Sequence, residues 1–266
     1  MLPNIALHPQ MLPTEPRYPR ISQVYESPPR YLFFNGDNSY GSLPASSILN
    51  VNQFSIAFWV RSDGPPHQSF DRPIEMLEWK KNSTGVPIAY GWAFDAGNIA
   101  KVGNNKLRFT VGNNLGNLST TLPVTIPSTT WTHIVGTFDG TRLKLYQNGV
   151  LGSASPKFAG LYSRPITPMP IQLAHGWLPK HYWTGDLSDI RIYNRAVSTQ
   201  EVRTIFQGNT ISSGLIGHWK LDEGSGNKIL DSSGYGNNGI IHNATWKISS
   251  SAISANATTS TTAAMP

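Results

Sequence analysis

The sequence predicts an all-β protein. Residues that form turns are abundant, with 24 Gly and 20 Pro among 266 residues. No long window shows the 3.6-residue apolar period of a major helix, whereas short apolar runs between turn residues recur along the chain. With 39% hydrophobic residues the chain can bury one sizeable core, and all-β sandwiches often occupy this length as a single domain.

The clearest local pattern lies in residues 131–149, WTHIVGTFDGTRLKLYQNG, which predicts a β-meander of three short strands. Asp139-Gly140 and Asn148-Gly149 are dipeptides that tolerate the positive φ angles of tight hairpin turns. Each dipeptide lies between apolar runs, as the turn of a hairpin does. Two hairpins in succession therefore join the three strands.

The faces of these strands differ in how clearly the sequence defines them. In the middle strand Leu143 and Leu145 alternate with basic residues, which is typical of a strand with one face on a core and one in water. In the preceding strand Ile134 and Phe138 lie on one face, and Val135 lies on the other. Spacing alone leaves open which of these two faces is inside.

Further strands are predicted wherever a short apolar run lies between turn residues, at 31–34, 54–60, 74–79, 89–94, 106–111, 171–173 and 187–193. In the run 54–60, Ile56 and Phe58 alternate with Ala57 and Trp59, so both faces carry apolar groups. A strand of this kind is expected near the centre of a sandwich.

A single short helix is predicted after the last of these strands. Ser198 and Glu201 form a capping box, in which the serine hydroxyl accepts from the Glu201 amide and the Glu201 side chain reaches back. Val197 and Val202 occupy the positions of a hydrophobic staple, and Gly208 is expected to end the helix.

Three ordered blocks of the sequence resemble one known family. They are YLFFNGDNSYGSLP with SIAFWV, then WTHIVGTFDG with LKLYQNG, then WTGDLSDIRIYNRAVSTQEVRTIF. These blocks are similar to the laminin G-like, or concanavalin A-like, lectin-glucanase modules and cover residues 31–208. The resemblance implies a two-sheet antiparallel jelly-roll sandwich with one short helix on its C-terminal side.

Residues 214–248 resemble the opening strands of such a module, which normally precede the first block. Two explanations are open: the segment begins a second, truncated module, or it has moved to the C-terminal side and completes the first. Alone, the segment would leave Trp219 and Trp246 in water, at a cost of about 25 cal/mol per Å² of apolar surface. A permuted single domain over 31–248 is therefore favoured, with exchange of the segment between subunits as a variant.

The two ends of the chain differ from this body in composition. Residues 1–30 form a Pro-rich arm, which is expected to be extended because closely spaced prolines prevent helix formation and sheet pairing. Residues 249–266 form a Ser-, Thr- and Ala-rich tail, also expected to be extended.

Charge and cysteine content exclude several classes of function. The formal net charge is +6, but the basic residues are scattered, so no nucleic-acid partner is predicted. The absence of cysteine excludes disulfides, thiolate metal sites and cysteine nucleophiles. Neither a signal peptide nor a membrane span is visible in the sequence, and the resemblance favours an extracellular, cell-surface or virion-surface location.

The carboxylates do not form the pattern that glycoside hydrolysis requires. Glucanases related to this fold place paired carboxylates on one face of a strand, to flank the sugar bond. Glu75 and Glu78 are three residues apart, which on a strand directs them to opposite faces, and so are Asp186 and Asp189. No Gly-x-Ser-x-Gly motif is present, and His133 is interpreted as structural. We therefore expect no enzymatic activity and no catalytic residues.

The resemblance implies a structural Ca²⁺ ion near the chain ends. Its ligands would be Asp189 together with Asp222 or Glu223, since Ca²⁺ prefers carboxylate and backbone oxygens. The alternative is that Asp222 and Glu223 are solvated ahead of a Gly-rich turn.

The loop that follows residues 171–173 carries the candidate ligand-binding residues. His175, Trp177, His181 and Tyr182 bring aromatic and imidazole groups together, and a carbohydrate site needs an exposed aromatic face beside hydrogen-bonding groups. The alternative for Trp177 is a packing role in the core or at a sheet edge.

These observations predict a non-catalytic recognition or assembly protein that binds glycan or protein through loops at one end of the sandwich. A second hypothesis is a structural component of a large particle, such as a minor capsid or surface-layer protein, whose arm and tail contact other subunits. A glucanase-type glycoside hydrolase is the weakest alternative. The partners expected are other protein subunits, glycan, or both.

Overall fold

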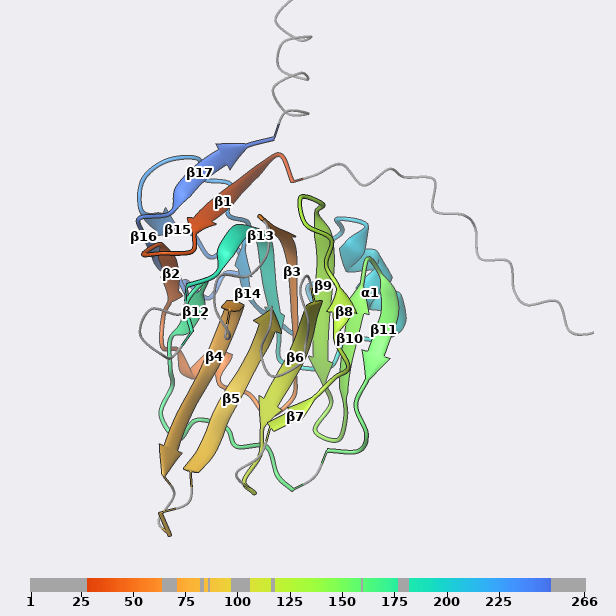
Figure 1. The fold of residues 1–266 in the computed structure, drawn as a ribbon. Coiled ribbons are helices and arrows are strands. Elements are labelled where there is room, and N and C mark those ends of the chain that lie inside the picture. Colours follow the sequence, from red (N-terminus) through yellow and green to blue (C-terminus); the bar gives the residue numbers. More distant parts are fainter. Residues whose placement is uncertain are drawn as a thin grey trace, which may run out of the picture.

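Two antiparallel sheets, of eight and nine strands, pack face to face in the computed structural model (Figure 1). The structure describes residues 28–63, 71–81, 84–85, 87–96, 106–115, 118–158, 160–176 and 182–249. Within them one short α-helix, α1 (Thr199–Phe206), and one 3-10 turn, η1 (Ser47–Leu49), accompany the sheets. The predicted all-β sandwich with a single short helix is confirmed.

The first sheet holds the meander and the strands that flank it. Its order is β11 (Val150–Ala154), β10 (Leu143–Gln147), β9 (Thr132–Phe138), β3 (Phe54–Ser62), β13 (Thr184–Tyr193), β1 (Arg30–Asn35) and β17 (Thr245–Ile248), and β14 (Leu215–Trp219) also pairs with β13. The central place of β3 in this order agrees with its apolar residues on both faces.

The second sheet covers the opposite side of the core. Its order is β15 (Lys228–Ile229), β16 (Gly239–His242), β2 (Tyr40–Leu43), β12 (Ile171–Leu173), β4 (Asp71–Lys81), β5 (Pro87–Ala96), β6 (Lys106–Gly112) and β7 (Leu118–Thr120), and β8 (Val124–Thr125) also pairs with β6. All the strand pairs in both sheets are antiparallel.

The predicted meander is formed by β9, β10 and β11. Gln147 pairs with Val150, so Asn148 and Gly149 form a two-residue turn, with φ angles of 48° and 78°. The other connection is longer than a two-residue turn, because Phe138 pairs with Leu143. That turn is held by the Asp139 carboxylate, which accepts hydrogen bonds from the backbone amides of residues 141 and 142 at 2.7 and 2.8 Å.

Both faces of β9 are buried, which explains why its sequence pattern was ambiguous. Ile134 and Phe138 lie in the main core between the sheets. Val135 lies in a second apolar cluster, together with Val202 and Ile205 of α1. The helix therefore covers the outer face of the first sheet beside β9, and β9 has no solvent face.

The start of α1 has the predicted capping box. The Ser198 hydroxyl accepts from the Glu201 amide at 3.2 Å, and the Glu201 carboxylate accepts from the Ser198 amide at 2.8 Å. Arg195 also pairs with Glu201 at 2.6 Å, and this hydrogen bond is the main cause that lowers the Glu201 pKa to about 2. Gly208 follows the helix with a φ of 79°.

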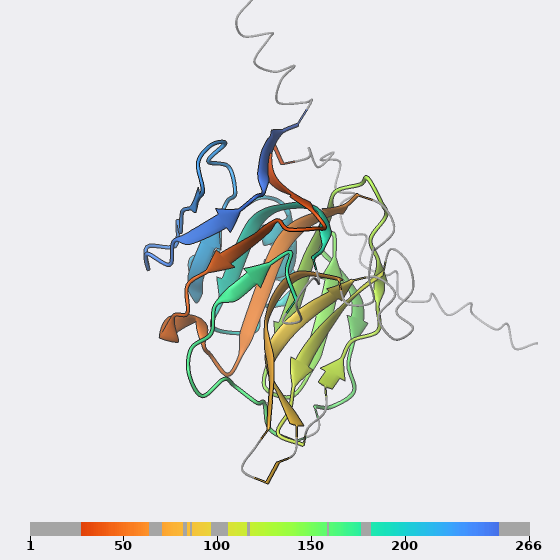
Figure 2. The same cartoon turned by 60° about the vertical axis from the view of Figure 1, so that its left-hand side comes forward.

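The segment after Gly214 contributes strands to both sheets. β14 pairs with β13, β17 pairs with β1, and β16 pairs with β2. Figure 2 shows β17, in dark blue, beside β1, in red. Trp219 is fully buried, and its indole N–H donates to the Asn237 carbonyl at 2.7 Å.

The predicted arm and tail fall mostly outside the described residues, which begin at Pro28 and end at Ser249. Arg30, assigned to the arm from sequence, is the first residue of β1. Neither helix of the described part has the length or apolar character needed to cross a membrane.

Candidate functional site

Strand register places three polar residues in one row across the second sheet. Gln172 of β12 pairs with Glu75 of β4 on one side and with Ser42 of β2 on the other. Residues paired across neighbouring strands point to the same face of a sheet. The flanking residues of β12, Ile171 and Leu173, are in the main core, so the row faces outward.

A groove of about 460 Å³ lies over this row. Glu75 and Gln172 line it, together with the rings of Tyr40, His175 and Tyr182. The His175 and Tyr182 ring centroids are 4.7 Å apart, and Tyr40 lies 5.6 Å from His175 and 6.4 Å from Tyr182. The rings therefore form one aromatic cluster at the side of the polar row.

Two of the four predicted ligand-binding residues, His175 and Tyr182, thus lie together. They also form a β-bridge with each other. The other two, Trp177 and His181, lie outside the described residues. The sequence did not single out Tyr40 or Gln172, because their position beside the loop depends on strand pairing.

Three polar groups of the groove have no hydrogen-bond partner within the described residues. They are the hydroxyls of Tyr40 and Tyr182 and the side-chain amide of Gln172. All three side chains are half-buried. A ligand in the groove would meet donors and acceptors that the fold itself does not use.

A buried ion network supports the floor of the groove. Arg72 donates to Glu75 at 2.6 Å and to Asp95 at 2.8 Å. Asp95 also accepts from Arg108 at 3.1 Å and from Thr110 at 2.7 Å. Burial alone would raise the Asp95 pKa, but the charges of Arg72 and Arg108 bring it below its ordinary value. Glu75 is thereby fixed in place beside Gln172.

The second hollow lies on the first sheet, where β13 changes partners. β1 pairs with β13 up to Leu187, and β14 pairs with it from Ile190 onward. The register with β3 shifts between Ser188 and Arg191, which marks a bulge. Asp189 lies in this bulge with a φ of 50°, a left-handed conformation that Asp tolerates better than most residues.

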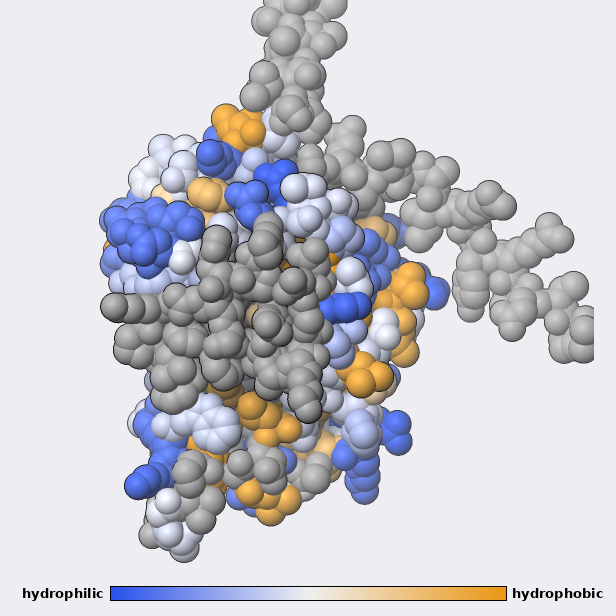
Figure 3. Space-filling view, in the orientation of Figure 1, coloured by the Kyte–Doolittle hydropathy of each residue, from blue (hydrophilic) through white to orange (hydrophobic). Residues whose placement is uncertain are grey.

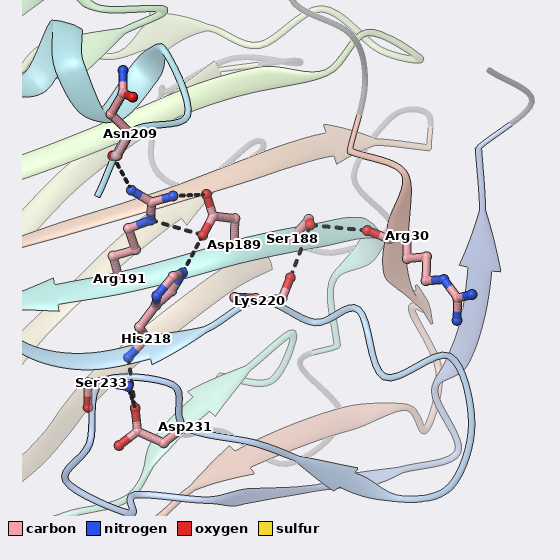
Figure 4. A network of polar contacts seen from close by, with 9 residues as sticks. All are labelled: Arg30, Ser188, Asp189, Arg191, Asn209, His218, Lys220, Asp231 and Ser233. Carbon is pink, nitrogen blue, oxygen red and sulfur yellow. Dashed lines mark hydrogen bonds and ion pairs between the residues drawn. The ribbon is translucent and has the colours of Figure 1, made fainter. Parts of the chain in front are cut away.

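Asp189 is the centre of the network drawn in Figure 4. Its carboxylate accepts two hydrogen bonds from Arg191, at 2.9 and 2.8 Å, and lies 2.8 Å from His218 Nε2. Arg191 also donates to the Asn209 carbonyl at 2.7 Å. Burial would raise the Asp189 pKa, but the His218 hydrogen bond and the Arg191 charge lower it to about 2.

This network borders a cavity of about 390 Å³ that both Asp189 and Asp222 line. Glu223, the third predicted metal ligand, accepts instead from the Leu230 amide at 2.7 Å. Among the described residues no group of three or more His, Asp or Glu side chains could hold a metal ion. The Asp189 carboxylate accepts hydrogen bonds from nitrogen donors, and this use of its oxygens does not fit a role in the oxygen-rich shell of Ca²⁺. The calcium site stays a prediction.

His133 is buried behind this cavity. Its ring packs against Trp59 at 5.1 Å and Phe206 at 5.7 Å between centroids. Burial lowers the His133 pKa to about 3, so the ring stays neutral at physiological pH. This environment fits a packing role and not proton transfer.

Apolar side chains on the described surface form separate patches in the view of Figure 3. Large exposed apolar residues include Leu122, Leu161 and Ile166, which are 74%, 72% and 90% exposed. In this view no broad apolar face is formed by the described residues. The groove over Gln172 and the cavity beside Asp189 are therefore stronger candidates for a binding site than the apolar residues seen in this view.

Comparison with known proteins places this fold in a family. Residues 35–203 match the family model of the concanavalin A-like lectin/glucanases superfamily. Mouse (Mus musculus) pappalysin-1 is 25% identical over 183 residues, which are 66% of this chain but only 11% of that protein. The chain therefore spans about a tenth of this curated relative.

Solved structures show the same fold at low sequence identity. A Bacteroides ovatus protein with a proposed role in carbohydrate binding has a TM-score of 0.63 and 16% identity, over 83% of this chain and 60% of that one. A heptameric SAP-like pentraxin from Limulus polyphemus has a TM-score of 0.50 and 15% identity, over 84% and 96%. These similarities and the described residues give no support to the capsid or virion alternative.

The family model covers more than half of the chain, and its fold is the two-sheet sandwich found here. The protein belongs to the concanavalin A-like lectin/glucanases superfamily.

Proposed function

We propose that the protein binds carbohydrate in the groove over β2, β12 and β4. The observation that carries the proposal is a set of polar groups, on Tyr40, Gln172 and Tyr182, that have no partner within the described residues and lie beside clustered aromatic rings. Sugars present apolar C–H faces and hydroxyl groups, so they are bound by aromatic surfaces flanked by hydrogen-bonding side chains.

The proposed role is binding without hydrolysis. A glycosidase needs one carboxylic acid that donates a proton to the leaving oxygen. Glu75 accepts a 2.6 Å hydrogen bond from Arg72 and is 1% exposed, so its carboxylate is held in a buried ion pair and does not face a leaving oxygen. Glu78, the other carboxylate at the groove, pairs with Lys80 at 2.7 Å. This arrangement favours a recognition site over an active site.

The comparisons support the proposal at the level of the fold. The similar Bacteroides ovatus structure has a proposed role in carbohydrate binding, and the family itself includes lectins. Because identity to that structure is 16%, its ligand does not transfer to this chain. The groove geometry, not the similarity, identifies the residues to test.

The test is a glycan microarray with the full chain, followed by titration calorimetry on each glycan that binds. Tyr182→Ala should weaken binding at least tenfold, because it removes one wall of the aromatic cluster. Tyr235→Ala is the matched control, since Tyr235 is 53% exposed and does not line the groove. Absence of binding to every glycan, or equal binding by the Tyr182→Ala variant, would refute the proposal.

A further inference from the structure

We propose that the groove selects neutral sugars and excludes sugars that carry a carboxylate or sulfate group. This inference rests on the proposed function and adds the class of ligand. It comes from the charges at the groove: the described residues that line it include Glu75 and Glu78 and neither Lys nor Arg. An acidic sugar would find no Lys or Arg side chain among them to pair with.

The arginines of the buried ion network below the groove do not give the groove a net positive charge. Arg72 lies between Glu75 and Asp95, with a bond to each, and Arg108 pairs with Asp95. The four groups carry two positive and two negative charges, so they neutralise one another. Of the four, Glu75 is the one that lines the groove, which places the carboxylate nearest the ligand and the guanidinium groups behind it.

Because the Glu75 carboxylate is buried, its charge acts strongly on any ligand in the groove. Glu75 is 1% exposed, and Arg72 is 3% exposed, so water screens them poorly. A second negative charge brought into the groove would meet the carboxylate in an environment of low effective dielectric. The ligand would also lose the hydration of its own charge without gaining an ion pair.

A neutral sugar fits the same groups. Its hydroxyls can donate hydrogen bonds to a carboxylate, and the amide of Gln172 offers both a donor and an acceptor. Gln172 is half-buried at the groove, so its amide can contact a sugar hydroxyl, while the buried carboxylate of Glu75 lies beside it across β12 and β4. The hydroxyls of Tyr40 and Tyr182, which line the groove, add further contacts at the side.

The test compares neutral and acidic forms of the same glycan. Two matched pairs serve as probes: laminarin with carboxylated laminarin, and fully methyl-esterified with de-esterified homogalacturonan, together with the neutral glycans that bind on the array. For each pair that binds in either form, the neutral form should bind at least tenfold more tightly. An acidic form that binds equally or more tightly, with binding lost in Tyr182→Ala, overturns this inference but leaves the proposed function standing.

Charge substitutions at Gln172 give a second measurement. Gln172→Lys supplies the missing cation and should narrow the neutral-to-acidic affinity ratio to threefold or less, whereas Gln172→Glu should widen it. Lys144→Glu on β10 is the control for net charge, because Lys144 does not line the groove, and it should leave the ratio unchanged. Melting temperatures close to that of the unmodified protein show that each variant is folded.

The outcomes separate the two proposals. A ratio that Gln172→Lys leaves unchanged in a folded variant overturns the selection mechanism. Absence of binding to every neutral and acidic glycan overturns the proposed function, and the inference with it.

Discussion

Both hollows are lined by polar and aromatic side chains, but they differ in how their central polar groups are used. Beside β13, Asp189 and Arg191 bond to each other, to His218 and to the Asn209 carbonyl. In the groove on the second sheet, the amide of Gln172 has no partner within the described part of the chain, and neither do two tyrosine hydroxyls. Volume does not separate the hollows, since they measure about 390 and 460 Å³.

We interpret the first hollow as a structural joint between β13, β14 and the turn after α1, and the second as the proposed binding site. The Asp189 network connects the bulge of β13 to β14 through His218 and to the turn after α1 through Asn209 (Figure 4). Its bonds stabilise the fold and leave the Asp189 and Arg191 side chains little capacity to bind a ligand. Perturbation of the joint should therefore change stability, and perturbation of the groove should change binding.

The largest expected effect is at the joint. Asp189→Asn removes the charge opposite Arg191, whose side chain is 5% exposed, and keeps a residue that tolerates the left-handed backbone. Loss of one partner of a buried ion pair costs about 3–5 kcal/mol, so the free energy of unfolding should fall by about that amount. Urea denaturation measures it, with the exposed Asp37→Asn as control. A loss below about 1 kcal/mol would show that the network is not structural.

The second effect is a dependence of stability on pH that arises from His133. Its folded-state pKa is about 3, against about 6.5 in the unfolded chain. Above pH 6.5 the group has no effect; below it, the unfolded state takes up a proton that the folded state does not. As the pH is lowered from 6.5 to 4.5, the free energy of unfolding should therefore decrease by about 1.4 kcal/mol per pH unit.

The measurement is urea denaturation at several pH values in that range. His133→Phe should remove this part of the slope, because no titrating group is left at the position. The other histidines are present in both proteins and serve as the internal control. An unchanged slope would mean that His133 does not titrate as its burial implies.

Local signals in the sequence predicted much of the first sheet. The Asn148-Gly149 turn and the Ser198 capping box depend on residues within a few positions of each other, and both are found in the structure. In the second sheet, the strand predicted at 171–173 has the same bounds as β12. The prediction of a two-residue turn at Asp139-Gly140 was wrong, because hydrogen bonds to the Asp139 carboxylate stabilise a longer connection.

The groove could be predicted only in part. His175 and Tyr182 stood out because aromatic and imidazole groups are concentrated in one short loop. Gln172 and Glu75 meet only through the pairing of β12 with β4, and nothing local specifies that register. One signal was available: Glu75 interrupts the apolar run of a predicted strand, and a charge at such a position usually has a buried partner.

A smaller effect is expected at the cap of α1. Ser198→Ala removes the hydroxyl that accepts from the Glu201 amide, and losses of this kind cost about 1 kcal/mol. Because α1 covers the first sheet and not the groove, glycan affinity should stay within twofold of the unmodified protein. Chemical denaturation and calorimetry measure the two quantities. Loss of affinity in a folded Ser198→Ala protein would link the helix to the site.

The smallest expected change in stability is at Gln172. Its amide has no hydrogen-bond partner within the described residues, so Gln172→Ala breaks no bond and should change the free energy of unfolding by less than about 0.5 kcal/mol. Its glycan affinity should nevertheless fall about five- to tenfold, the amount that one or two lost hydrogen bonds to a ligand cost. Gln147→Ala on β10 is the matched control: its amide donates to the Thr125 carbonyl, away from the groove, and its affinity should be unchanged. If Gln172→Ala instead lowers stability and leaves affinity intact, the groove and the joint have the same structural role, and the distinction between them fails.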